Sequence, residues 1–83
     1  MSGTNNMANA TGTVDRREAA ITVNGEARAF AGATVADLLR ELGLHPQLIV
    51  VEHNRSILDR GRFETTPVRS GDVFELVHFV GGG

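Results

Sequence analysis

The sequence contains no cysteine and no lysine. Without cysteine, the 83-residue chain forms no disulfide, binds no metal through thiolates and has no cysteine nucleophile. All eight basic residues are arginines, so the chain has no side-chain amine. A chain whose carboxylate becomes activated could acylate its own lysine amines, so the absence of lysine would be useful. An arginine-biased composition is the simpler explanation.

The sequence also lacks the marks of nucleic-acid and membrane proteins. Its net charge of −2 excludes the clustered excess of Lys and Arg that binds phosphate backbones. Its apolar runs are only a few residues long, far short of the roughly 20 residues that span a bilayer. Residues 1–6 have neither the basic start nor the apolar segment of a signal peptide. We therefore expect a cytoplasmic protein that binds neither nucleic acid nor membrane.

The length allows one small domain, which buries only about 60% of the surface that its unfolded chain exposes. Residues 1–18 are rich in Asn, Thr and Gly and show no apolar period, which predicts a disordered N-terminal leader. The predicted domain then spans residues 19–80, and a flexible glycine tail follows at residues 81–83.

A β-hairpin is predicted around Asn24-Gly25, because this dipeptide tolerates the positive φ angles of a type I′ turn. A two-residue loop fixes the strand register and places Ile21, Val23 and Phe30 on one face, toward the core. The predicted pairs are Val23 with Glu26, Ile21 with Arg28, and Ala19 with Phe30.

A helix is predicted next, starting after Thr34. Thr34 stands three residues before Asp37, a variant of the capping box. Gly43 and Pro46 supply the stop signals at the other end. The apolar positions between them follow the i, i+3, i+4, i+7 spacing of one buried stripe, namely Val35, Leu38, Leu39 and Leu42.

The remaining segments complete an α+β fold, a mixed sheet of four to five strands with one main helix packed across it. Residues 48–51 are apolar without alternation and predict an interior strand that is covered on both faces. Ile57-Leu58 predicts a short strand, and Phe63 is the predicted anchor of an irregular crossing over residues 59–66. The last strand should lie between the first strand and the central apolar one.

Alternation along the last strand predicts which residues meet a partner. Phe74, Leu76, His78 and Val80 point one way, so Val77 and Phe79 point the other, beside the chain end. Exposed apolar groups there form a candidate docking surface. Val77, Phe79 and Val80 are the predicted partner-binding residues; the alternative is that the protein itself covers both faces of the strand.

Other groups with chemical potential fit no site. His45, His53 and His78 are too irregularly spaced for a zinc site, and no metal site is predicted. Glu52 and His53 are neighbours on a strand and point to opposite faces, so they cannot easily act on one atom. A solvated strand end is the predicted setting of this pair.

The strongest functional signal is Gly81-Gly82-Gly83, which follows directly on strand-forming residues without a polar linker. Glycine has no Cβ, so this tail can enter a channel too narrow for other residues. Three extended residues give it a reach of roughly 10 Å. The predicted reactive group is therefore the carboxylate of Gly83, although a frayed chain end would leave the same tail without a function.

Four stretches of the chain resemble the ThiS family, the sulfur carriers of thiamine thiazole biosynthesis, and the resemblance covers residues 21–83. The resemblance implies a ubiquitin-like β-grasp fold. The stretches are residues 23–26, 32–39, 70–72 and above all Val77-His78-Phe79-Val80-Gly81-Gly82-Gly83.

The resemblance also implies a mechanism. A ThiF-like enzyme would adenylate the carboxylate of Gly83 with ATP, and a sulfur donor protein would convert the acyl-adenylate to a thiocarboxylate. A ThiG-like thiazole synthase would accept the sulfur. The carrier would bind no cofactor and have no catalytic residue, because it is a co-substrate of partner enzymes.

Two alternatives remain open at the level of sequence. MoaD, the small subunit of molybdopterin synthase, has the same fold and a Gly-Gly end, although about 65 structured residues are short for that family. A ubiquitin-like modifier or interaction module would instead use Gly83 for isopeptide bonds or leave the tail inert.

Overall fold

The first hairpin forms as its turn residues predict. Asn24 and Gly25 have φ angles of 50° and 83°, as a type I′ turn requires. The turn joins β1 (Ala19–Val23) to β2 (Glu26–Phe30), and the antiparallel register is the predicted one, from Ala19 opposite Phe30 to Val23 opposite Glu26.

The helix α1 (Val35–Leu42) begins and ends at its predicted caps. The Thr34 hydroxyl accepts the Asp37 N–H at 3.3 Å, while the Asp37 carboxylate accepts the Thr34 N–H at 3.1 Å. Gly43 adopts φ 73° and closes the C-terminal end. Hydrogen bonds from Arg40, then from the backbone N–H groups of Ala33 and Thr34, lower the pKa of Asp37 to about 2. The stabilisation from this charged cap is therefore complete above the ordinary pKa of 3.8 and is lost as the pH falls toward 2.

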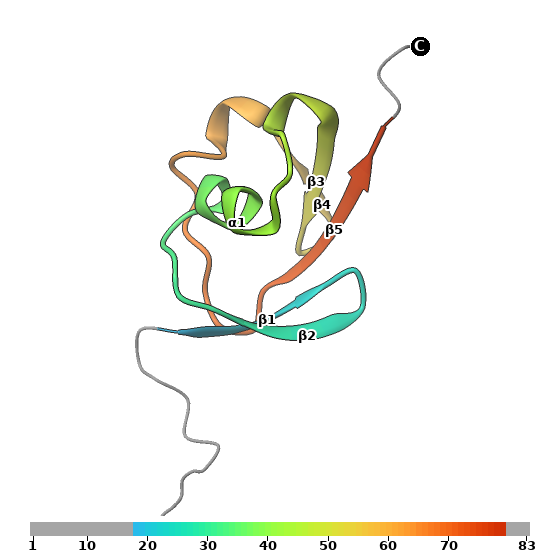
Figure 1. Ribbon diagram of the computed structural model, residues 1–83. Coiled ribbons are helices and arrows are strands. Elements are labelled where there is room, and N and C mark those ends of the chain that lie inside the picture. Colours follow the sequence, from blue (N-terminus) through green and yellow to red (C-terminus); the bar gives the residue numbers. More distant parts are fainter. Residues whose placement is uncertain (1–17, 80–83) are drawn as a thin grey trace, which may run out of the picture.

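The computed structural model describes residues 18–79, which form one five-stranded mixed sheet with α1 across one face (Figure 1). The predicted leader and glycine tail lie outside the described residues, apart from residue 18, so their boundaries stay predictions. The strand order is β2-β1-β5-β3-β4, which confirms the predicted central place of the last strand. The further elements are η1 (Pro46–Leu48), β3 (Ile49–His53), β4 (Ser56–Leu58), η2 (Arg60–Arg62) and β5 (Val73–His78).

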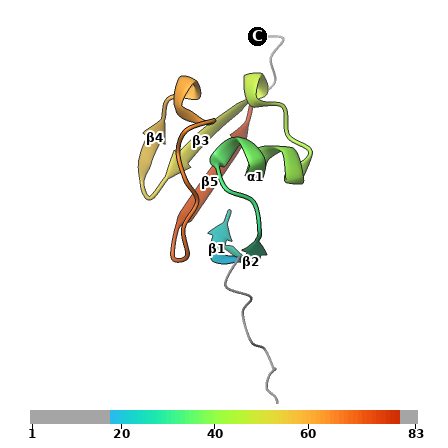
Figure 2. The same ribbon diagram turned by 90° about the vertical axis from the view of Figure 1, so that its left-hand side faces the viewer.

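The core lies between α1 and the sheet face behind it (Figure 2). Phe30 and Phe74 are its largest fully buried side chains. Phe63 is 3% exposed and is the predicted anchor of the crossing segment, and its carbonyl accepts the Ala36 N–H at 2.9 Å. The other buried apolar residues are Ile21, Val35, Ala36, Leu38, Leu39, Ile49, Val51 and Leu76.

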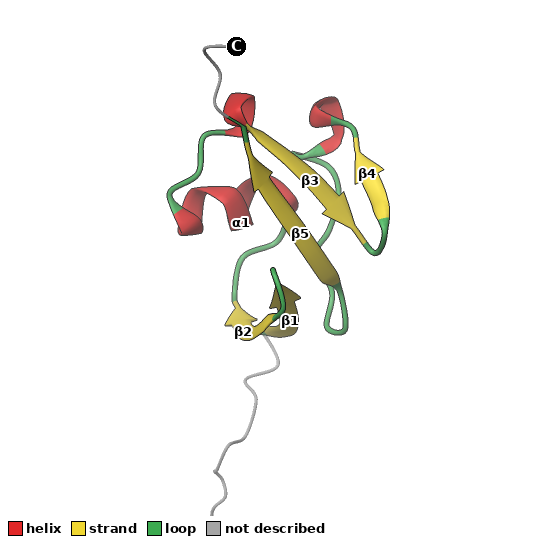
Figure 3. Ribbon diagram, turned by 90° about the vertical axis from the view of Figure 1, so that its right-hand side faces the viewer, coloured by secondary structure: helices red, strands yellow, loops and turns green. Residues whose placement is uncertain are grey.

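One expectation about coverage was wrong. The strand over residues 48–51 was expected to be covered on both faces, but Val50 is only half-buried and Leu48 lies in η1 with 38% of its surface exposed. In Figure 3 no described helix covers β3 and β5 on the side away from α1. The reason is the two-layer architecture, because the single described α-helix covers one face of the sheet only.

The pairing of β5 with β1 is extended by a side chain. These strands run parallel, with Val23 opposite Phe74 at the end of β1. Beyond that point the Asn24 side chain replaces the strand: its Oδ1 accepts the Leu76 N–H at 2.7 Å, and its Nδ2 donates to the Leu76 carbonyl at 3.3 Å. The Asn24 N–H also donates to the Phe74 carbonyl at 2.8 Å. One turn residue therefore fixes the middle of β5.

We predict that Asn24→Ala destabilises the protein by about 1–3 kcal/mol, because both backbone groups of Leu76 lose their Asn24 partner, with a further cost for the positive φ. Asn24→Gly is the control, since glycine tolerates this φ and removes only the side-chain hydrogen bonds. Both variants should accelerate hydrogen exchange of the Leu76 amide. In denaturant unfolding, Asn24→Ala should lose more unfolding free energy than Asn24→Gly, because only alanine is strained at this positive φ. An unchanged Leu76 exchange rate in both variants would show that this side chain does not hold β5.

We also predict that Leu38→Ala costs on the order of 2–5 kcal/mol of unfolding free energy, because Leu38 is fully buried on the core side of α1. Ile57→Ala is the comparison, since Ile57 is 67% exposed and should cost less than about 0.5 kcal/mol. Urea denaturation of both variants provides the measurement. Equal losses would mean that α1 does not form the core described above.

Candidate functional site

The end of β5 is the described feature nearest to the predicted reactive group. β5 pairs with β1 on one side and with β3 on the other, where Ile49 lies opposite His78. The Phe79 N–H donates to the Leu48 carbonyl at 3.1 Å, so the chain is held against η1 up to the last described residue. The predicted site residues Val80, Gly81, Gly82 and Gly83 lie outside the described residues.

The face of the sheet away from α1, which Figure 3 shows, carries exposed apolar side chains beside that end. Val77 is 58% exposed and Phe79 38%, which confirms the predicted facing of the last strand. Val50 lies opposite Val77, and Phe79 bonds to Leu48. We call this surface the outer patch and define it by Val50, Ile57, Val73, Val77 and Phe79.

Sequence reasoning found only part of the outer patch. Val77 and Phe79 were predicted from alternation on one strand. Val50 and Ile57 belong to the patch because both lie on the outer side of β3 and β4, Ile57 directly opposite Glu52. Val50 could have been found from Glu52, which lies two positions further along the strand and therefore points to the same face. A charged residue on that face argues against a strand that is covered on both faces.

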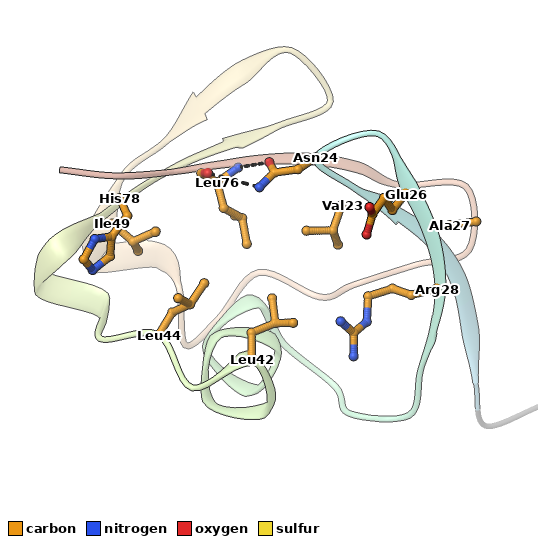
Figure 4. Close-up of a pocket in the computed structure, with 10 residues that line it drawn as sticks. All are labelled: Val23, Asn24, Glu26, Ala27, Arg28, Leu42, Leu44, Ile49, Leu76 and His78. Atoms are coloured by element: carbon orange, nitrogen blue, oxygen red, sulfur yellow. Dashed lines mark hydrogen bonds between the residues drawn. The ribbon is translucent and has the colours of Figure 1, made fainter.

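A second feature, which sequence reasoning missed, is a groove of about 530 Å³ on the helix side (Figure 4). It opens between the hairpin, the C-terminal end of α1 and the end of β5. Leu42, Leu44 and Leu76 give it an apolar floor, while His78 lies at one end and Arg28 at the other (Figure 4). His78 lies at the opposite end of the groove from Glu26 and Arg28 (Figure 4), so the groove does not bring a general acid and a general base together at one point.

The prediction that His53 lies at a solvated strand end is wrong, because its side chain is largely buried. Its ring stacks on Phe74 with centroids 4.8 Å apart, and its Nε2 lies 3.0 Å from the Asp72 carboxylate. Partial burial raises the pKa of Asp72, but hydrogen bonds from the Arg69 N–H, the Asn54 side chain and His53 outweigh it and lower that pKa below 3.8. These contacts fix the start of β5, so the interaction of His53 with Asp72 has a structural explanation. Glu52 points to the opposite face of β3 from His53, as predicted.

Within residues 18–79, no group of three or more His, Asp or Glu side chains is placed to hold a metal ion. In the same part of the chain, no helix is long and apolar enough to cross a membrane. β5 takes part in both the outer patch and the groove.

Comparisons with known proteins place the chain in a family. The ThiS family matches residues 21–83. The sulfur carrier protein ThiS of Bacillus subtilis is 40% identical over 50 residues, which are 60% of this chain and 76% of that protein. A thiazole synthase of Magnetococcus marinus is 41% identical over 64 residues, which are 76% of this chain but only 20% of that protein. The chain thus spans about a fifth of the length of the thiazole synthases that it matches.

A solved structure supports the same assignment. The crystal structure of the thiamine biosynthesis protein ThiS from Geobacter metallireducens superposes with a TM-score of 0.66 at 37% identity, covering 77% of this chain and 99% of that one. This agreement confirms the predicted β-grasp fold, a mixed sheet with one main helix. With the family match over residues 21–83 and the likeness to the Bacillus carrier, the chain belongs to the ThiS family.

Proposed function

We propose that this protein is the sulfur carrier of thiamine thiazole synthesis and that it carries sulfur as a thiocarboxylate at Gly83. The observation that carries the proposal is the match to the ThiS family, which extends through the three terminal glycines. The likeness to the Bacillus sulfur carrier supports it independently.

The chemistry follows from the weakness of a carboxylate as an electrophile. A ThiF-like partner binds ATP, and an oxygen of the Gly83 carboxylate attacks the α-phosphorus and releases pyrophosphate. The acyl-adenylate has a good leaving group, so hydrosulfide released by a donor protein can attack the acyl carbon, displace AMP and, after loss of its proton, leave the thiocarboxylate. The partners supply catalysis and the cofactor, while this chain supplies a substrate group and the surface by which it is recognised.

The proposed sulfur acceptor is a ThiG-like thiazole synthase. The support is that two thiazole synthases each contain a segment 41% identical to this chain. In those proteins a segment like this carrier belongs to the same polypeptide as the synthase, which favours a direct transfer of sulfur between the two. The match to the ThiS family likewise favours thiazole synthesis over the molybdopterin pathway of MoaD.

We place the first docking contact of the adenylating enzyme on the outer patch. Val77 and Phe79 are exposed there, near the C-terminal end of β5 and shortly before the tail. Val80, which follows Phe79, is proposed to extend this contact toward the enzyme's active site. Docking at this point would aim the tail at the nucleotide, since the described chain is held by the bond between Phe79 and Leu48.

The first test concerns the carboxylate. Adding one residue after Gly83 moves the reactive oxygen by up to about 3.3–3.6 Å, far from attack geometry, so adenylation should collapse. Gly82→Val should also fail, because a β-branched side chain widens and stiffens the tail. ATP–pyrophosphate exchange with the cognate ThiF-like enzyme measures the first step, and intact mass after addition of a sulfur donor measures the exchange of oxygen for sulfur.

Both variants should keep the circular dichroism spectrum and the melting temperature of the unmodified chain. Activation of the extended variant at the normal rate would overturn the proposal, because Gly83 would then not be the reactive group. Lysine-linked conjugates of the protein in its native host would instead identify a protein modifier.

The second test concerns docking. Val77→Ser combined with Phe79→Ser should raise the KM for the carrier in the exchange assay, because a few buried apolar contacts carry most of the energy of an interface. The melting temperature should change little, since both side chains are exposed in the free protein. A large fall in melting temperature with an unchanged KM would show that these residues stabilise the domain and do not bind the enzyme.

A further inference from the structure

Two glutamates face each other in the middle of the outer patch. Glu52 on β3 is the direct cross-strand partner of Glu75 on β5. Side chains in such a position have Cβ atoms about 4.5–5.5 Å apart, and like charges placed there destabilise a sheet. The pair therefore lowers the stability of the folded domain, and an interaction with another molecule would explain why it is present.

No arginine compensates this pair within the part of the chain that the structure describes. The arginine ion pairs there are Arg28 with Glu41, and Arg40 with both Asp37 and Glu64. The remaining ion pair joins His53 to Asp72, on the opposite side of β3 from Glu52. Among residues 18–79, neither carboxylate of the pair has an ion-pair partner.

Aliphatic side chains flank the two glutamates on β3, β4 and β5. Val50 and Val77 form the neighbouring cross-strand pair on the same face, and Val73 lies two residues before Glu75. Ile57 stands opposite Glu52 on the other neighbouring strand and is 67% exposed. Charges of this kind protect sheet edges from aggregation in many proteins, but β3 and β5 are interior strands, so that explanation does not apply.

We infer that the outer patch binds a protein surface that is apolar around one projecting arginine, and that the guanidinium of this arginine bridges Glu52 and Glu75. A guanidinium presents five N–H donors in one plane and can bond to two carboxylates at once. The flanking aliphatic side chains would exclude water around that contact, and the lower local dielectric would strengthen it.

Other occupants of the patch fit less well. A second copy of this chain, docked face to face about a two-fold axis, would bring its own Glu52 and Glu75 against the first pair and place four carboxylates together. Nucleic acid and anionic lipid carry the same sign of charge as the pair and would be repelled. The charge of the patch therefore selects a cationic partner, and its aliphatic side chains select a protein surface.

This inference rests on the proposed function in one respect, because the partner to be tested is the cognate ThiF-like adenylating enzyme. The experiment is calorimetric titration of that enzyme with the full chain in the absence of ATP. Glu52→Gln combined with Glu75→Gln should weaken binding roughly tenfold, which corresponds to about 1.4 kcal/mol. Its melting temperature should equal or exceed that of the unmodified protein, because the repulsion between the two carboxylates is removed.

The matched control is Glu26→Gln combined with Glu64→Gln, which changes the net charge equally at sites outside the outer patch. The control should alter the dissociation constant by less than about twofold. Equal weakening by both double variants would overturn the inference, because net charge alone would explain it. Unchanged binding of the Glu52 and Glu75 variant, or a marked fall in its melting temperature, would overturn it as well.

The two proposals fail in different ways. If the unmodified chain binds the enzyme but is not adenylated when ATP is added, the proposed function is wrong while the inference about the patch stands. If the unmodified chain does not bind the enzyme at all, the inference is overturned.

Discussion

The structure depends on the position of β5 between β1 and β3. A parallel contact with β1 covers only two residue pairs, Thr22 with Val73 and Val23 with Phe74. The side chain of Asn24 extends that contact to Leu76, and the antiparallel pairing with β3 holds the other edge as far as His78. Since β5 leads directly to the terminal glycines, this pairing sets both the core and the point from which the tail departs.

The two faces of the sheet have different tasks because one helix covers only one of them. On the covered face, buried residues of α1 and of the sheet, among them Ile21, Val51 and Phe74, form one hydrophobic core. On the other face, the outer patch stays exposed at a cost in solvated apolar area. That cost is reasonable in a protein whose proposed activity is to be recognised by enzymes, since its binding surface then lies beside the group that they modify.

The proposed mechanism divides the work between carrier and partners. A bare carboxylate at the end of a narrow tail is chemically inert, and this inertness lets the carrier exist free in solution until an enzyme activates it. Specificity must therefore come from docking. The outer patch offers both an apolar contact and, at Glu52 and Glu75, a charge contact that would distinguish one apolar partner surface from another.

Sequence alone determined the features that depend on neighbours along the chain. The positive φ angles at Asn24-Gly25 set the hairpin register, and Thr34, Asp37 and Gly43 set the ends of α1, because turns and caps are local interactions. Alternation likewise assigned Val77 and Phe79 to the outer face. Tertiary structure decided what depends on segments distant in sequence: the bond of Asn24 to Leu76, the pairing of His53 with Asp72, the exposure of Val50 and the groove beside His78. Periodicity shows which residues share a face, but only the packed fold shows which other segment, if any, covers that face.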